Sequence, residues 1–130
     1  MNVPDNYPFS EASMKYLCLI YDEESLWQKM SQDEMGRMMG EYNAFGSDIK
    51  ASGHYIGGEA LQPTSSATTI RVLNGKTITS DGPFAETNEQ LGGFYMIEAK
   101  DLNDALQVAA RIPGAKLGSI EVRPIMVFNQ

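Results

Sequence analysis

The segment best suited to chemistry is Ser80 to Thr87, which reads SDGPFAET and places two carboxylates, Asp81 and Glu86, around a Gly-Pro step. Proline fixes its own φ angle and restricts the residue before it, so Pro83 predicts a rigid loop that holds Asp81 at the end of a strand. A carboxylate held in this way can accept a proton from a substrate. Asp before Gly-Pro is also ordinary in turns, where its side chain accepts backbone N–H bonds. The residues alone leave both interpretations of Asp81 open.

Two other side chains are candidates for proton transfer. His54 follows a predicted helix at the start of a strand, and the near-neutral titration of imidazole suits a proton shuttle. Glu86 follows the Gly-Pro turn. Each has an ordinary structural explanation as well, the histidine bonded to a carbonyl or solvent and the glutamate solvated or paired with arginine. The predicted catalytic residues are Asp81, His54 and Glu86.

A ligand beside this loop would contact side chains from the neighbouring strands. Tyr16 and Tyr95 have phenolic hydroxyls, and Arg71 is a mid-strand cation that needs an acidic partner or an anionic ligand. The pairs Gly57-Gly58 and Gly92-Gly93 leave a cavity in the sheet wall or permit bulges. Packing and structural ion pairs are the ordinary explanation for the tyrosines and the arginine. The predicted ligand-binding residues are Tyr16, Arg71, Pro83, Phe84 and Tyr95.

Composition narrows the class of protein. The chain has 130 residues, 42% of them hydrophobic, which fits one domain with its own core. A net charge of −7 disfavours nucleic acid and anionic membranes as partners. One cysteine and one histidine cannot supply a structural zinc site, and the longest apolar run, Tyr16 to Tyr21, is too short to span a bilayer. We expect a cytoplasmic protein without metal, cofactor, nucleic acid or membrane.

Hydrophobic periodicity then places the candidate residues on elements. Residues 1–13 have no periodicity and predict an extended arm. Ser31 with Glu34 predicts a capping box, and apolar residues at spacings of three and four extend the helix to Ser52, where Gly53 is available as a cap. A second helix begins at Asp101 and stops at Pro113-Gly114. The predicted strands are Met14–Tyr21, His54–Leu61, Ala67–Leu73, Lys76–Thr79, Gly92–Ala99 and Ser119–Val127.

The order of these elements predicts an α+β fold. Asn74-Gly75 is typical of a two-residue hairpin turn, and removing that extra β-hairpin leaves the split βαβ pair of a ferredoxin-like antiparallel sheet with two helices on one face. Several strands are apolar on both faces, although the helices cover only one. A second copy of the sheet is the simplest cover for the other face, so we predict a homodimer.

Several segments resemble the DGPF branch of the YCII-related proteins: DGPFAETNEQLGGFYMIEA (Asp81 to Ala99), MKYLCLIY, GHYIGGEALQP, ATTIRV and EVRP. The resemblance covers Met14 to about Phe128, which divides the chain into an arm of residues 1–13 and a domain of residues 14–128. It implies a dimeric α+β barrel of ferredoxin-like subunits, with Asp81 as the motif carboxylate. The YCII branch carries a histidine soon after its first strand, paired with an aspartate. Asp22 to Lys29 contains no histidine, so that dyad does not carry over.

Two classes of function follow. The first is a cofactor-independent small-molecule enzyme of the proton-transfer type, an isomerase or lyase, with a pocket near the DGPF loop; the wider barrel superfamily includes isomerases and oxygenases that act on small ring compounds. The alternative is a non-catalytic homodimer that binds a ligand or a protein in a regulatory role. A closed, apolar-walled pocket that a second titratable group reaches favours catalysis.

Overall fold

Residues 13–128 are described by the computed structural model, so the predicted arm of residues 1–13 lies outside the described part except for Ser13. Four strands form an antiparallel sheet in the order β2-β5-β1-β6, and two more form a separate hairpin. The elements are β1 (Met14–Asp22), α1 (Glu24–Gln28), α2 (Gln32–Ala51), β2 (Tyr55–Ala60), η1 (Thr64–Ser66), β3 (Thr68–Leu73), β4 (Lys76–Asp81), β5 (Gln90–Ala99), α3 (Leu102–Ala110), η2 (Pro113–Lys116) and β6 (Ser119–Pro124).

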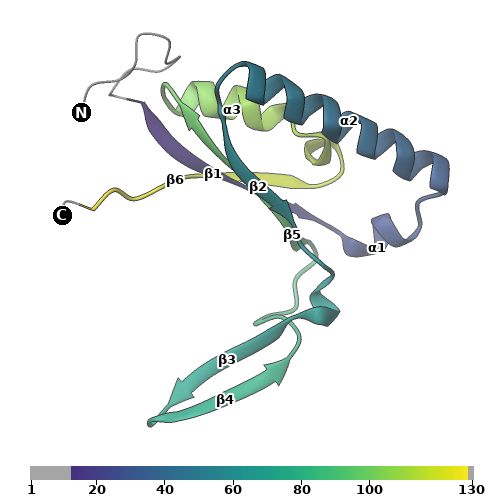
Figure 1. Cartoon of the computed structure of the whole chain (residues 1–130). Coiled ribbons are helices and arrows are strands. Elements are labelled where there is room, and N and C mark those ends of the chain that lie inside the picture. Colours follow the sequence, from purple (N-terminus) through teal and green to yellow (C-terminus); the bar gives the residue numbers. More distant parts are fainter. Residues whose placement is uncertain (1–12, 129–130) are drawn as a thin grey trace.

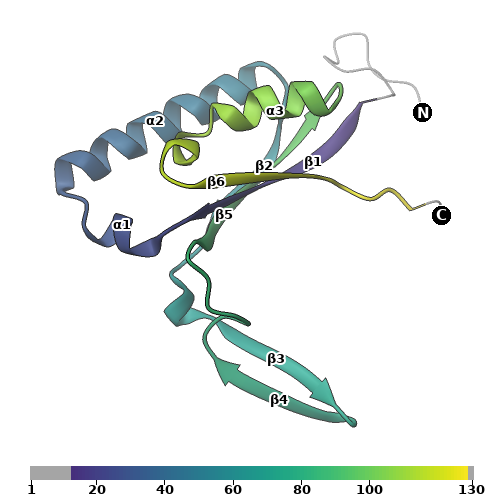
Figure 2. The same ribbon diagram turned by 180° about the vertical axis from the view of Figure 1, so that it is seen from behind.

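The sheet carries α2 and α3 on the same face, as both views show (Figure 1, Figure 2). Without the hairpin, the strand order is the second, third, first and fourth of the chain, which is the ferredoxin-like arrangement. The predicted α+β fold is therefore confirmed. Among the described residues, no helix is both long and apolar enough to cross a membrane.

Alternation along β1 separates a covered face from an open one. Tyr16, Cys18 and Ile20 are buried against the helices, whereas Leu17 and Leu19 on the other face are only half-buried. The buried face meets a core to which α2 and α3 contribute apolar residues, among them Phe45, Ile49, Ala105 and Val108. Burial raises the pKa of the Cys18 thiol to about 11, so Cys18 stays protonated and acts as a small apolar core residue.

Local signals set the ends of α2. Ser31 accepts the Glu34 N–H at 3.1 Å, and Glu34 accepts the Ser31 N–H at 3.2 Å, which completes the predicted capping box. At the other end the chain turns at Gly53, whose φ of 83° a residue with a Cβ rarely adopts.

The β3–β4 hairpin extends away from the sheet, beyond the end where β2 stops and β5 starts (Figure 1). Asn74 and Gly75 both have positive φ angles, 52° and 77°, as the predicted hairpin turn requires. The hairpin leaves Ile70 63% and Val72 65% exposed in a single chain.

Several predicted strand ends differ from the observed ones, most of them by one or two residues. β4 continues to Asp81, which pairs with Thr68, so Asp81 ends the strand rather than starting the loop. β6 ends at Pro124 instead of Val127, although the Ile125 N–H still donates a hydrogen bond to the Lys15 carbonyl oxygen at 2.9 Å.

Candidate functional site

A cavity of about 830 Å³ lies between α2 and the β1, β5 and β2 strands. Seven residues of α2 line it at spacings of one, three and four, so they lie on one face of the helix. They are Met35, Met39, Tyr42, Asn43, Gly46, Ser47 and Lys50. Met38, Phe45 and Ile49, which belong to the predicted apolar stripe, are buried in the core instead. Some residues of α2 therefore pack in the core, and others form one wall of the cavity.

Glycines allow close contacts between β2 and β5 on the sheet side of the cavity. A Cβ on Gly58 would lie 2.8 Å from both the Phe94 carbonyl oxygen and the Tyr95 ring, and a Cβ on Gly93 would lie 2.9 Å from the Glu59 carbonyl oxygen. The β2–β5 ladder shifts register between Tyr55 and Gly57. The β1–β5 ladder also shifts, and its pairs pass from Gly93 to Leu91 and leave Gly92 out. Both predicted consequences of the glycine pairs, bulges and a cavity in the sheet wall, are present.

The most unusual side chain in the cavity wall is Asp22, the last residue of β1. It is only 3% exposed, and Trp27 Nε1 donates a hydrogen bond to its Oδ2 at 2.7 Å. Among the described residues, none donates a hydrogen bond to the other oxygen, Oδ1, which lies 3.5 Å from where a Cβ on Gly92 would sit. Burial raises the pKa of the Asp22 carboxyl, the charges of Glu89 and Glu24 raise it further, and the Trp27 hydrogen bond opposes them. Asp22 is thus a buried carboxyl with a free oxygen in a cavity.

Tyr42 brings a second titratable group into the same cavity wall. Its hydroxyl oxygen accepts the Gly114 N–H at 3.1 Å, which leaves the O–H proton for another acceptor. Burial raises the pKa of Tyr42 to about 12, and the nearby Asp22 charge contributes to the rise. Tyr42 therefore stays protonated at neutral pH and can donate a hydrogen bond. Gly114 permits this contact, because a Cβ there would lie 2.7 Å from the Tyr42 hydroxyl.

The short helix α1 is tied to the remainder of the site by Glu24. The Glu24 carboxylate accepts the N–H of Thr64 at 2.6 Å and its hydroxyl at 2.9 Å. The Glu24 N–H donates to Gln90 Oε1 at 3.0 Å. These bonds join α1 to η1 and to the first residue of β5, and so fix the helix that positions Trp27 beside Asp22.

The DGPF loop does not line this cavity in a single chain. Asp81 is exposed at the base of the hairpin, and in the described part of the chain its carboxylate accepts no hydrogen bond. Phe84 is 78% exposed, and Pro83, Glu86 and Arg71 are exposed too. Gly82 has a φ of 97°, which suits glycine alone. The roles predicted for these residues stay predictions, and a single chain gives them no shared site.

Of the two tyrosines predicted to bind a ligand, only Tyr95 lines the cavity. Its ring packs edge-on against Phe45, with 5.2 Å between centroids. Tyr16 is 2% exposed and belongs to the core.

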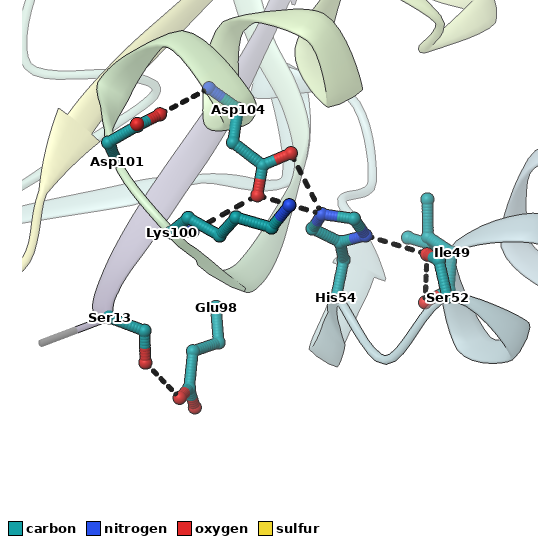
Figure 3. A network of polar contacts seen from close by, with 8 residues as sticks. All are labelled: Ser13, Ile49, Ser52, His54, Glu98, Lys100, Asp101 and Asp104. Carbon is teal, nitrogen blue, oxygen red and sulfur yellow. Dashed lines mark hydrogen bonds and ion pairs between the residues drawn. The ribbon is translucent and has the colours of Figure 1, made fainter. Parts of the chain in front are cut away.

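His54 immediately precedes β2. The start of β2 is the end of that strand remote from the hairpin (Figure 1). Figure 3 shows its contacts: Nε2 lies 3.1 Å from Asp104 Oδ2, and Nδ1 lies 2.6 Å from Ser52 Oγ. Burial alone would raise the pKa of Asp104, but hydrogen bonds from the Lys100 N–H and His54 outweigh it and lower the pKa. Ser52, His54 and Asp104 do not line the cavity, and their contacts join the end of α2 to the start of α3.

Sequence reasoning missed Asp22 and Tyr42 as functional candidates. One signal was available for Asp22, because the alternation that buries Tyr16, Cys18 and Ile20 places it on the same covered face. A charged residue at such a position needs a partner or a function. For residues 13–128, no group of three or more His, Cys, Asp and Glu side chains is arranged to hold a metal ion.

Fold and site together define a small α+β protein with a ferredoxin-like sheet and a ligand-sized cavity under its long helix. The family model of the YCII-related domain matches residues 14–129. The chain is also 39% identical over 118 residues to an uncharacterised protein of Rhizobium meliloti (strain 1021), with 89% of this chain and 95% of that protein covered. The chain belongs to the YCII-related family, as its motifs implied.

Proposed function

We propose that the protein is a cofactor-independent enzyme that moves a proton on a small organic substrate, with Asp22 as the acid–base group. The observation that carries this proposal is a buried carboxyl, 3% exposed and with a raised pKa, in the wall of a cavity of about 830 Å³. A raised pKa brings a carboxylate closer to the neutral range, where a general base works best.

The surroundings of Asp22 suit proton abstraction next to a carbonyl group. Asp22 Oδ1 takes the proton as the C–H bond breaks, and the electron pair of that bond forms a C=C bond and an enolate oxygen. The Tyr42 O–H donates a hydrogen bond to that oxygen, while Trp27 holds Asp22 Oδ2 in place. When the substrate carries a C=C bond next to the reacting carbon, the anion is a dienolate. Return of the proton from Asp22 to the far carbon of the dienolate moves the double bond into conjugation, re-forms the carbonyl and restores the carboxylate.

This proposal is tested by solvent-deuterium incorporation. The protein is incubated in D₂O with a panel of small carbonyl compounds, chosen with aromatic or apolar substituents, and exchange of the protons next to the carbonyl is followed by NMR. We expect catalysed exchange for at least one member of the panel. A non-catalytic binding module would shift the melting temperature with a ligand but would leave exchange at its uncatalysed rate.

We also propose that the chain acts as a cytoplasmic homodimer. Leu17 and Leu19 on the open sheet face are only half-buried, and Ile70, Val72 and Phe84 are exposed on and near the hairpin. Apolar surface of this extent is usually covered by a partner. A chain with one cysteine forms no internal disulfide, as is usual in the reducing cytoplasm.

Sedimentation velocity at micromolar concentration tests the dimer. We expect a species of twice 14.3 kDa, because a contact through the sheet faces buries more than about 1,200 Å². A single species of 14.3 kDa at every concentration would contradict it.

A further inference from the structure

Lys50 provides the cavity with a positive charge. It lies in the last turn of α2, on the helix face that lines the cavity, and its Nζ is 4.9 Å from the centroid of the Tyr55 ring. This cation–π contact holds the ammonium group against the cavity wall. None of the ion pairs found in the described part of the chain involves Lys50, so its charge has no carboxylate partner among these residues.

Lys50 and Asp22 lie at opposite ends of the cavity. Met35 and Lys50 are the first and last cavity residues of α2, and the helical rise separates them by about 22 Å. Strand pairing gives a similar separation along the sheet. Asp22 pairs with Gln90, and Tyr55 pairs with Ile97, seven residues further along β5. This separation exceeds the Debye length of about 8 Å at physiological salt. A ligand group at one end therefore responds to the charge at that end.

The wall between the two ends is largely apolar. Met39 is 53% exposed, and the rings of Tyr42 and Tyr95 lie on the same wall. Gly46 adds no side chain, and a Cβ there would meet nothing within 4 Å. An apolar or aromatic group along this part of α2 would cover surface that water otherwise contacts.

We propose, on the basis of the proposed function, that the substrate is an elongated organic anion. Its carboxylate pairs with the Lys50 ammonium, its apolar or aromatic body lies along α2 past Gly46, and its reacting carbon lies beside Asp22. Lys50 is then a binding residue that sets which end of the substrate reaches Asp22. A cationic substrate would need the opposite arrangement, with its charge beside Asp22 and Glu24.

The test compares three probes that differ only in the terminal group: 6-phenylhexanoate, its primary amide and 6-phenylhexylamine. Binding to the full chain is measured by calorimetry at low and at physiological salt. We expect the carboxylate to bind about five- to tenfold more tightly than the amide, because a partly exposed charge pair contributes about 1 kcal/mol. The amine should bind most weakly, and the preference for the carboxylate should shrink as salt rises.

Variants assign this preference to Lys50. Lys50→Met should lower carboxylate affinity to that of the amide and leave the amide unchanged, and Lys50→Arg should retain most of the preference. Lys116→Met is the matched control, since Lys116 pairs with Glu41 on the surface and does not line the cavity. It also removes one lysine charge, and the affinities of all three probes should stay unchanged.

Equal binding of carboxylate and amide, tighter binding of the amine, or no binding of any probe at millimolar concentration would overturn the inference. Its failure differs from failure of the proposed function. If the carboxylate preference depends on Lys50 but deuterium exchange is absent, the anion site stands and the acid–base role of Asp22 fails. If exchange depends on Asp22 but the amide binds as well as the carboxylate, only the anion site fails.

Discussion

Asp22→Asn is expected to unfold at a higher temperature than the wild type at pH 7 and to lose at least 100-fold in proton exchange. The loss follows because amide nitrogen and oxygen do not act as a general base, a role that contributes about 10²- to 10⁴-fold. The melting temperature rises because the variant no longer buries a charge, while its amide oxygen can still accept the Trp27 hydrogen bond. Lower activity with higher stability is typical of a residue retained for function.

The pH dependence of this stability difference has a defined sign. The pKa of Asp22 is raised in the folded protein, so the wild type loses stability as pH rises through that pKa. Below about pH 3 the carboxyl is protonated in both the folded and the unfolded chain, so wild type and variant should have equal stability. Chemical denaturation at pH 3, 5 and 7 measures the difference. A variant that is less stable at pH 7 would mean that Asp22 has a structural role.

Asp81→Asn is the matched control for Asp22→Asn, because it makes the same chemical change at an exposed carboxylate that accepts no hydrogen bond among residues 13–128. Its stability and its exchange rate should equal those of the wild type. Exchange that is lost in Asp81→Asn and kept in Asp22→Asn would transfer the acid–base role to the DGPF loop.

Gly46→Leu should fill the cavity and weaken ligand binding more than tenfold while it stabilises the fold. A Cβ at Gly46 meets nothing within 4 Å, so the first atom of the new side chain fits without displacing a neighbour, and the rest of it enters the cavity. Leucine is also favoured over glycine in a helix by about 1 kcal/mol, which corresponds to roughly 3 to 5 °C in melting temperature.

Gly40→Leu separates these two effects. Gly40 lies on the same helix, is exposed, does not line the cavity and also has nothing within 4 Å of an added Cβ. Both variants should melt at higher temperature, but only Gly46→Leu should lose the thermal shift given by 6-phenylhexanoate. Equal binding by the two variants would show that the ligand does not occupy this cavity.

Features coded by neighbouring residues were predictable from the sequence. Ser31 and Glu34 form a capping box within one turn, and Asn74-Gly75 sets a hairpin turn through two φ angles. The order of the strands then leaves few ways to build a sheet, and the ferredoxin-like arrangement is the one observed.

The candidate site was only partly predictable, because residues distant in the sequence assemble it. Asp22 becomes a cavity residue through its Trp27 contact, the bare Cα of Gly92 and the register shift in the β1–β5 ladder. Met35, Met38 and Met39 all belong to the apolar spacing of α2, yet only Met38 is buried. Which face of a long helix meets a cavity depends on how the sheet twists beneath it, and periodicity alone does not contain that information.

The acid–base role of Asp22 is tested most directly by an NMR titration of its side-chain carboxyl, assigned by the signal that disappears in Asp22→Asn. Burial of Asp22 predicts a pKa above the ordinary value of about 3.9 for aspartate. A pKa at or below 3.9 would mean that Asp22 is a well-solvated or ion-paired carboxylate, and this result would contradict its proposed role as the acid–base group.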